Sequence, residues 1–170
     1  QRFFTASDGG HVAYRTYPGP AALQLVLIHG SACFGDQFHL AAARLSGQGL
    51  ATIHTLDMRG HGKSSARVDD FRRFSRDVAE FCALLEAQNP GCRIVIGGHS
   101  AGGGLVLNVA RQAGFERIAG WLLLAPFVGI SDPSVRPYFG GWVREFRRLR
   151  FILVVAANAL GIRRFNDIPL

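Results

Sequence analysis

The chain has 170 residues, of which 48% are apolar and 18% charged. This composition supports one sizeable core and excludes an intrinsically disordered protein. The formal net charge is +7, and seven Arg and one Glu between Pro133 and Arg164 supply +6 of it. This basic segment matches no nucleic-acid-binding module, so we expect no nucleic-acid partner.

The sequence also argues against several kinds of membrane, secreted and metal protein. No apolar run approaches the ~18–20 residues that a membrane span needs, and no secretory leader is visible after Gln1. Cys33, Cys82 and Cys92 have no C-x-x-C spacing, which argues against a disulfide framework or a zinc site. We expect all three to be small buried side chains in a reducing compartment, which favours the cytoplasm.

Apolar strands alternate with amphipathic helices, which predicts an α/β fold with a mostly parallel sheet and helices on both faces. Asp8-Gly9-Gly10 predicts a hairpin between the first two strands. Asp36 is the predicted N-cap of the first helix. In chain order, the predicted elements are strands over 2–7, 11–17 and 23–28, a helix over 35–47, a strand over 51–56, a helix over 70–88, a strand over 93–96, a helix over 103–112 and a strand over 118–124.

The character of the sequence changes after Pro126. Residues 129–141 are rich in Pro, Gly and Ser, and a basic, helical stretch follows over 142–160. We therefore predict a core of six strands over residues 1–126 and the start of a helical cap or lid over residues 127–170.

The stretch GGHSAGGG at residues 97–104 contains the pattern G-x-S-x-G, centred on Ser100. It follows a predicted strand and opens a predicted helix, as in a nucleophile elbow, where a strained turn exposes a reactive serine. Gly98 and Gly102 would allow the strand and the helix to approach closely, and the helix N-terminus would favour developing negative charge. The alternative is a tight turn with a buried, hydrogen-bonded serine, because so short a pattern also arises by chance.

A second loop, His29-Gly30-Ser31, follows the buried strand over 23–28. Ligands bind outside the carboxyl ends of parallel strands, so we expect this loop and the elbow to share one crevice. Acyl transfer needs backbone donors aimed at the oxyanion, and the N–H groups of Ser31 and Ala101 are the natural pair. We expect His29 to brace the loop rather than to act in catalysis.

Three segments resemble the α/β-hydrolase superfamily, in particular its lysophospholipase, monoglyceride-lipase and serine-aminopeptidase-like branch. They are LVLIHGS (25–31), LDMRGHGKS (56–64) and IGGHSAGGG (96–104), in the order and spacing of that branch. The resemblance implies an α/β-hydrolase fold in which Ser100 is the nucleophile and Ser31 and Ala101 supply the oxyanion hole.

The same resemblance implies a structural role for the loop that contains Asp57, Arg59 and His61. Other branches of the α/β-hydrolase superfamily fit this sequence less well. No HGGG loop is present, which argues against the hormone-sensitive-lipase type of oxyanion hole, and Ser100 stands where similar dehalogenases and epoxide hydrolases have Asp.

In this superfamily a catalytic acid and then a histidine follow the nucleophile, but all six histidines precede Ser100. The resemblance also implies two further strands, without which the strand over 118–124 would lie at the sheet edge with unpaired backbone groups. We expect a fold that is incomplete at its C-terminal end, with the acid and base beyond residue 170 and the 170 residues inactive alone. The alternative to an incomplete fold is a naturally short relative that is inactive or uses an unusual base. Asp132 is a candidate for the catalytic acid, or else a turn residue.

Residues 142–164 join an arginine cluster to an apolar face. A basic amphipathic helix can contact anionic lipid head groups, which would place the protein peripherally on a membrane. The alternative is a cap helix that packs on the core with its arginines in water.

These patterns predict a serine hydrolase of carboxylic esters, with a lipid-like or apolar acyl group as its small-molecule substrate and no metal or organic cofactor. A peptide or thioester hydrolase of the same fold stays open. A non-catalytic protein that binds a ligand in the same crevice is the alternative from another class, because a fold alone does not establish activity.

Overall fold

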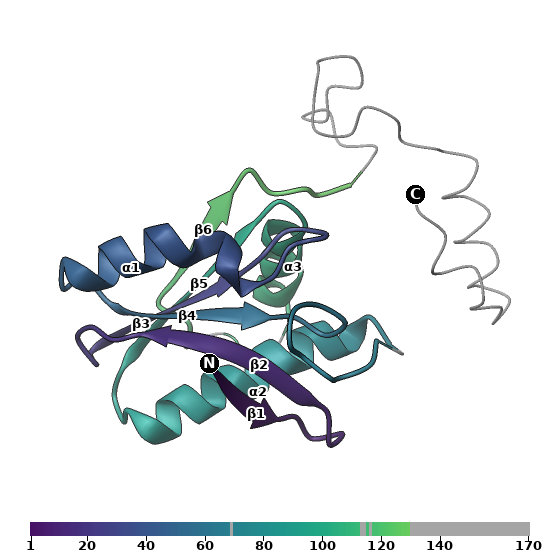
Figure 1. Ribbon diagram of the computed structural model, residues 1–170, viewed down its shortest axis with the longest axis horizontal. Coiled ribbons are helices and arrows are strands. Elements are labelled where there is room, and N and C mark those ends of the chain that lie inside the picture. The colour runs from purple at the N-terminus through teal and green to yellow at the C-terminus, as the bar shows by residue number, and fades with distance from the viewer. Residues whose placement is uncertain (69, 113–114, 116, 130–170) are drawn as a thin grey trace, which may run out of the picture. The chain divides into compact units, whose positions relative to one another are not determined.

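The computed structural model describes residues 1–68, 70–112, 115 and 117–129. Figure 1 shows the strands and helices of these residues. The strands are β1 (Arg2–Thr5), β2 (His11–Tyr17), β3 (Leu23–Ile28), β4 (Thr52–Asp57), β5 (Arg93–His99) and β6 (Gly120–Leu124). The helices are the short 3₁₀ helix η1 (Gly35–Phe38) and the α-helices α1 (His39–Gly47), α2 (Arg72–Gln88) and α3 (Ala101–Ala110).

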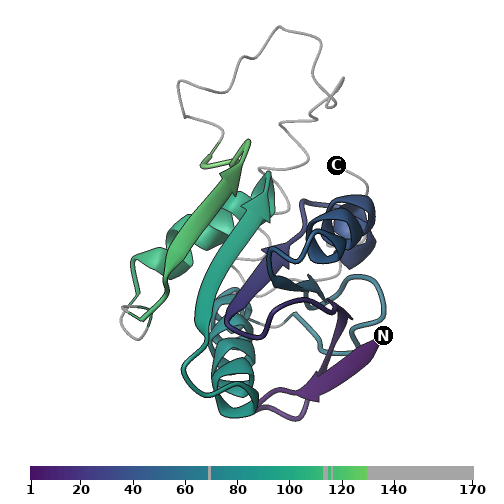
Figure 2. The ribbon, with the colours of Figure 1, turned by 90° about the vertical axis from the view of Figure 1, so that its left-hand side faces the viewer.

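All the described strands belong to one sheet with the order β1-β2-β4-β3-β5-β6. The hairpin β1–β2 is antiparallel and β2 joins β4 in antiparallel register, whereas β4, β3, β5 and β6 run parallel. Ile28 pairs with both Leu56 and Gly98, so the parallel strands end level with one another. Figure 2 shows β5 and β6 side by side with their arrowheads at the same end.

Helices cover both faces of the sheet, as the sequence predicts. Helices α2 and α3 pack on one face, where Val78, Phe81 and Val106 are fully buried against strand residues such as Val26. Helix α1 packs on the other face through Ala42. Successive strand residues point to opposite faces, so a buried strand contributes to both cores. The predicted α/β-hydrolase architecture is confirmed for the described residues (Figure 2).

The segment over 35–47 is not one helix, and the prediction of Asp36 as its N-cap is wrong. It divides into η1 and α1, neither of which has a side-chain cap. Asp36 lies inside η1, where its carboxylate accepts from Arg15 Nε at 3.0 Å. Phe38 and Ala42 are both buried, but apolar residues at this spacing do not distinguish a 3₁₀ turn from an α-helical one.

Other differences concern element ends and burial. Strand β5 runs three residues further than predicted, to His99, and α3 begins at Ala101. Phe71 is 73% exposed because it precedes the first turn of α2. Cys82 is buried, but Cys33 and Cys92 are half-buried, so the expectation that all three are buried holds for one.

Strand β6 lies at one edge of the described sheet, as the sequence predicts. Each of its residues Trp121–Leu124 is 37–38% exposed. The predicted cap beyond Gly129, with Asp132 and the basic stretch over 142–164, lies outside the described residues. The boundary near Phe127 and the anionic-membrane contact therefore stay predictions. Within the described ranges, no helix combines the length and apolarity of a membrane span.

Candidate active site

Ser100 joins strand β5 to helix α3 in a backbone conformation that L-residues rarely adopt. Its φ is 52° and its ψ is −119°, and its side chain does not cap the helix. Such a conformation costs on the order of 1–3 kcal/mol and persists only where the surroundings hold it. The sharp strand–turn–helix geometry is the one that the pattern over 97–104 predicts.

Two glycines make this turn sterically possible. A Cβ at Gly98 would overlap the backbone of Gly102, and a Cβ at Gly102 would overlap the carbonyl oxygens of Ile28 and His29. The N-terminus of α3 therefore packs directly on the ends of β3 and β5. This confirms the predicted reason for small residues two positions before and two positions after Ser100.

The chain after β6 holds the turn from the other side. Ser100 N–H donates to the Leu124 carbonyl at 3.0 Å, and Phe127 N–H donates to the Ser100 carbonyl at 2.8 Å. The non-glycine residues with positive φ in the described part of the chain are Ala32, Ser100 and Ala125. These three follow β3, β5 and β6, so the backbone strain gathers at the carboxyl ends of three adjacent parallel strands.

The His29-Gly30-Ser31 loop lies directly beside the elbow. A Cβ at Gly30 would lie 3.3 Å from Ser100 Cβ and 3.2 Å from His99 Nδ1. The side chain of Gln37, from η1, spans the two segments: its Oε1 accepts from Gly30 N–H at 2.9 Å and its Nε2 lies 2.7 Å from His99 Nδ1. No sequence motif marks Gln37, because its role depends on the 3₁₀ turn that brings its side chain back to the loop.

His29 braces this loop, as expected. Its Nε2 accepts from Met58 N–H at 3.0 Å, so its Nδ1 carries the proton and donates to the Gly30 carbonyl at 2.7 Å. Burial lowers the pKa of His29, which keeps this neutral form. Both ring nitrogens are thus engaged in holding backbone.

The two residues whose N–H groups are predicted as oxyanion donors follow β3 and β5, which are adjacent strands. In the described residues, the backbone N–H groups of Ser31 and Ala101 donate to no protein acceptor. Ala101 is the first residue of α3, where N–H groups lack intrahelical partners and the helix dipole favours an anion. The arrangement can therefore offer two donors to a negatively charged oxygen near Ser100.

No base for Ser100 is present among the described residues. The Ser100 hydroxyl has no hydrogen-bond partner there, and every histidine of the chain bonds to another group. The histidines and these partners are His11 with Thr5, His29 with Gly30 and Met58, His39 with Tyr17, His54 with Thr16 and Gln24, His61 with the Arg59 carbonyl and His99 with Gln37.

The loop after β4 has the structural role that the resemblance implied. The buried Asp57 carboxylate accepts from Gly35 N–H at 2.8 Å and from Lys63 N–H at 2.9 Å. The buried Arg59 forms a bidentate pair with Asp77 of α2, at 2.6 and 2.7 Å. The hydrogen bonds of Asp57 and Arg59 therefore fix the loop and its neighbours, and none of them is made to Ser100.

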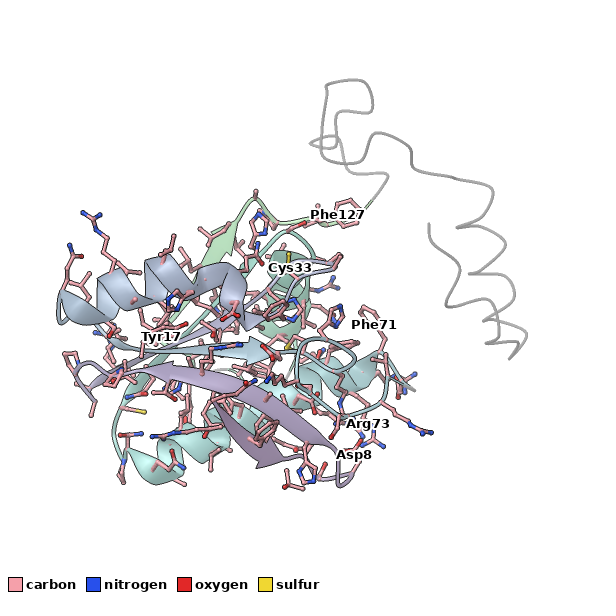
Figure 3. The ribbon with its side chains drawn as sticks, viewed as in Figure 1. Asp8, Tyr17, Cys33, Phe71, Arg73 and Phe127 are labelled. Carbon is pink, nitrogen blue, oxygen red and sulfur yellow. The ribbon has the colours of Figure 1, made fainter. Side chains whose placement is uncertain are left out.

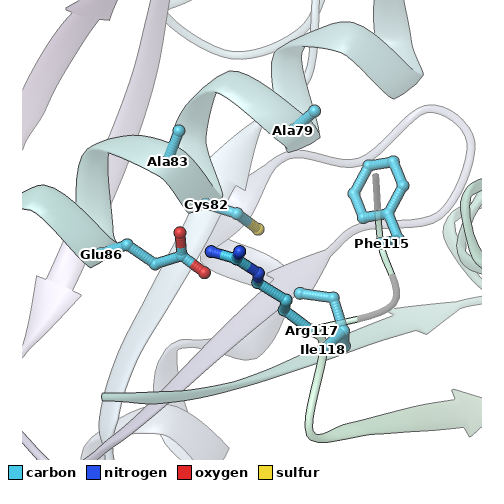
Figure 4. Close-up of a pocket in the computed structure, with 7 residues that line it drawn as sticks. All are labelled: Ala79, Cys82, Ala83, Glu86, Phe115, Arg117 and Ile118. Carbon is cyan, nitrogen blue, oxygen red and sulfur yellow. The ribbon is translucent and has the colours of Figure 1, made fainter. Parts of the chain in front are cut away.

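A hollow lies away from Ser100 (Figure 4). Its volume is about 310 Å³, and it lies between α2 and the segment that leads into the amino end of β6, whereas Ser100 follows the carboxyl end of β5. Glu86 and Arg117 point toward one another over a floor that includes Cys82. Burial raises the pKa of the Cys82 thiol to about 12, so this thiol is not a nucleophile at neutral pH. The described residues contain no cluster of His, Cys, Asp or Glu fit to hold a metal ion.

The parallel sheet, the strained serine between strand and helix, and the neighbouring loop after β3 define an α/β-hydrolase fold. Residues 19–164 match the serine aminopeptidase S33 family, and the chain belongs to that family.

Relatives with known names agree with this assignment. A monoacylglycerol lipase of Mycolicibacterium smegmatis is 33% identical over 140 residues, which are 81% of this chain and 44% of the lipase. The human monoglyceride lipase is 32% identical over 135 residues, which are 75% of this chain and 43% of that protein. The chain thus spans less than half the length of these relatives.

A solved structure shares the fold. It is a soluble variant of monoglyceride lipase from Saccharomyces cerevisiae with a substrate analog, which superimposes with a TM-score of 0.73 at 24% identity. The match covers 93% of this chain and 52% of the yeast chain.

Proposed function

We propose that the protein is a serine hydrolase of carboxylic esters, with Ser100 as its nucleophile. The observation that carries this proposal is the strained backbone of Ser100, which lies at the carboxyl end of β5 between two other strained loops. A buried structural serine needs no such conformation. The family membership and the names of the relatives support the same chemistry.

In the proposed reaction, Ser100 Oγ attacks the ester carbonyl carbon and its proton passes to a base. The carbonyl π electrons move onto oxygen, and the N–H groups of Ser31 and Ala101 stabilise this oxyanion. Collapse of the tetrahedral intermediate restores the carbonyl, expels the alcohol with the proton from the base and leaves an acyl-enzyme that water hydrolyses. Since the histidines of this chain are bonded elsewhere, we propose that the base comes from outside residues 1–129.

We propose that the preferred ester substrates carry an apolar acyl group. Phe34 follows the loop after β3 and is 41% exposed, and Phe127 and Val128 follow β6 and are 44% and 47% exposed. Phe127 and Val128 lie just after the strand next to β5, and Phe127 N–H bonds to the Ser100 carbonyl, whereas the Phe34 ring lies against Arg15 of β2. An apolar chain that covers these apolar side chains would gain about 25 cal/mol for each Å² of apolar surface removed from water.

A non-catalytic binding protein is the second candidate, and the engagement of all six histidines favours it. It would use the same strained loops to hold a ligand without turning it over. Under this candidate, Ser100→Ala leaves ligand binding intact and there is no activity to lose.

Turnover of p-nitrophenyl esters from acetyl to dodecanoyl by the complete protein that carries this chain tests the proposal. We expect turnover that rises with acyl length and disappears in Ser100→Ala. Faster turnover of peptide or thioester substrates would correct the substrate class. A folded complete protein that binds the long esters but hydrolyses none would favour the binding protein.

A further inference from the structure

The Gln37 side chain is exposed, yet both of its polar ends bond to the protein. One end meets the loop after β3 and the other meets the residue before Ser100. Gln37 therefore bridges the two backbone segments that the proposed reaction needs in register.

The direction of both hydrogen bonds of Gln37 follows from its contact with the Gly30 N–H. Gly30 N–H can only donate, so the Gln37 atom 2.9 Å away is its carbonyl oxygen. The Gln37 amide nitrogen then faces His99 Nδ1 at 2.7 Å and must donate to it. His99 Nδ1 is consequently the acceptor, which leaves the proton of a neutral His99 on Nε2.

Hydrogen bonds hold Gly30 at both its backbone N–H and its carbonyl. The Gly30 carbonyl accepts from His29 Nδ1 at 2.7 Å and from Cys33 N–H at 3.3 Å. A trans peptide is planar, so the Ser31 N–H points opposite to this carbonyl. His29 thus sets the direction of the proposed oxyanion donor, and Gln37, through Gly30 N–H, sets its position relative to the elbow.

We propose that Gln37 is a positioning residue, which acts with His99 to hold the Ser31 N–H against the oxygen that becomes negative when Ser100 attacks. This inference rests on the proposed ester hydrolysis. A displaced donor weakens binding of the transition state more than binding of the substrate, because the charge on oxygen develops only in the transition state. The loss therefore falls on kcat rather than on KM.

The test uses steady-state ester hydrolysis by the complete protein with Gln37→Met, which keeps the length of the side chain and removes both hydrogen bonds. Loss of a full oxyanion donor lowers kcat about 100-fold to 1000-fold, so a misplaced one is expected to lower it roughly 10-fold to 100-fold with little change in KM. His99→Phe is expected to give a similar loss, and the double variant no further loss, because both changes break one bridge.

A conservative variant and a matched control separate positioning from general damage. His99→Asn keeps a side-chain acceptor and is expected to recover part of kcat. Gln48→Met changes an exposed glutamine that has no side-chain partner in the described residues and is expected to leave kcat unchanged. The imidazole ¹⁵N spectrum of wild type is expected to show the His99 proton on Nε2, and Gln37→Met is expected to mix the two tautomers.

Each outcome has one meaning. Wild-type turnover with an unchanged kcat in Gln37→Met would overturn the positioning role and leave the proposed function standing. Additive losses in the double variant, or a His99 proton on Nδ1 in wild type, would overturn the bridge. A complete wild-type protein without ester turnover would overturn the proposed function and with it the role of Gln37.

Discussion

Ser100 is held in its strained conformation by contacts on three sides. The absence of a side chain at Gly102 allows α3 to pack against the end of β3. The Leu124 carbonyl accepts from Ser100 N–H, and Phe127 N–H donates to the Ser100 carbonyl. Such a residue is stable only because the surrounding backbone is fixed, so small changes there are expected to disturb it.

Gly102→Ala is expected to destabilise the protein by about 1–3 kcal/mol, as overpacking does in well-packed regions. The added Cβ would overlap the carbonyl oxygens of Ile28 and His29, which are backbone atoms of a buried strand end. The free energy of unfolding from urea titrations measures this cost.

Gly47→Ala is the matched control, since a Cβ at Gly47, the last residue of α1, meets nothing within 4 Å. Alanine is the better helix former, so this change is expected to be neutral or to stabilise by up to about 1 kcal/mol. A Gly102→Ala protein as stable as Gly47→Ala would contradict the close packing of α3 on β3.

At the residue scale, the sequence predicts those site residues whose role follows from a local rule. It does not predict residues whose role depends on tertiary contacts. The glycines around Ser100 are predictable because a strand-to-helix turn needs small residues at fixed offsets. Gln37 is not, since its role depends on a 3₁₀ turn that returns its side chain to Gly30. The local pattern predicts Asp36 as a helix cap, but its carboxylate pairs with Arg15 on β2, and no local pattern reveals that contact.

At the element scale, Arg59 ties three parts of the fold together. It bonds to Asp77 on α2 and, at 2.7 and 2.9 Å, to Asp8 in the β1–β2 turn, while itself lying in the loop after β4. Arg73 of α2 adds an ion pair with Asp8 at 3.2 Å, and Figure 3 shows these two side chains next to one another. The buried Arg59 thus carries its charge among compensating carboxylates.

This linkage predicts a pH-dependent contribution of Asp8 to stability. Hydrogen bonding to Arg59 holds the pKa of Asp8 well below its usual value. A carboxyl whose folded pKa is lowered stabilises the fold fully above its unfolded pKa of about 4 and loses this effect as the pH falls toward the folded value. Asp8→Asn is therefore expected to be less stable than wild type at neutral pH, with a difference that shrinks below about pH 4.

Urea unfolding of both proteins between neutral and acidic pH measures this difference. A gap that stays constant as the pH falls would show that the Asp8 carboxylate does not gain its stabilising effect from ionisation in the folded state.

Element types were predictable from the sequence, whereas some of their ends were not. Alternating strands and helices gave the correct order because each buried strand reads as an apolar run. Strand β5 extends beyond its predicted end at Ile96, because pairing with β3 and β6 on both sides continues the strand through Gly97 and Gly98. The helix predicted over 70–88 begins at Arg72, so Phe71 lies before its first turn.

At the scale of the whole molecule, the described residues form the part of an α/β-hydrolase fold that holds the proposed nucleophile. The proposed nucleophile and the two proposed oxyanion donors follow the carboxyl ends of adjacent strands, while the histidines form other hydrogen bonds. The family could be predicted from three ordered motifs because each of them fixes a loop of the fold. The base could not, since no residue in the expected place follows Ser100 in the described chain.

Labelling with a fluorophosphonate probe tests the central claim most directly, because the probe needs both an activated serine and an oxyanion hole. The complete protein is expected to be labelled at Ser100 and Ser100→Ala to stay unlabelled. Ser31→Ala is expected to be labelled like wild type, since the proposed donor is the backbone N–H, which alanine keeps. A folded complete protein that is not labelled, or a label on another residue, would contradict Ser100 as the nucleophile.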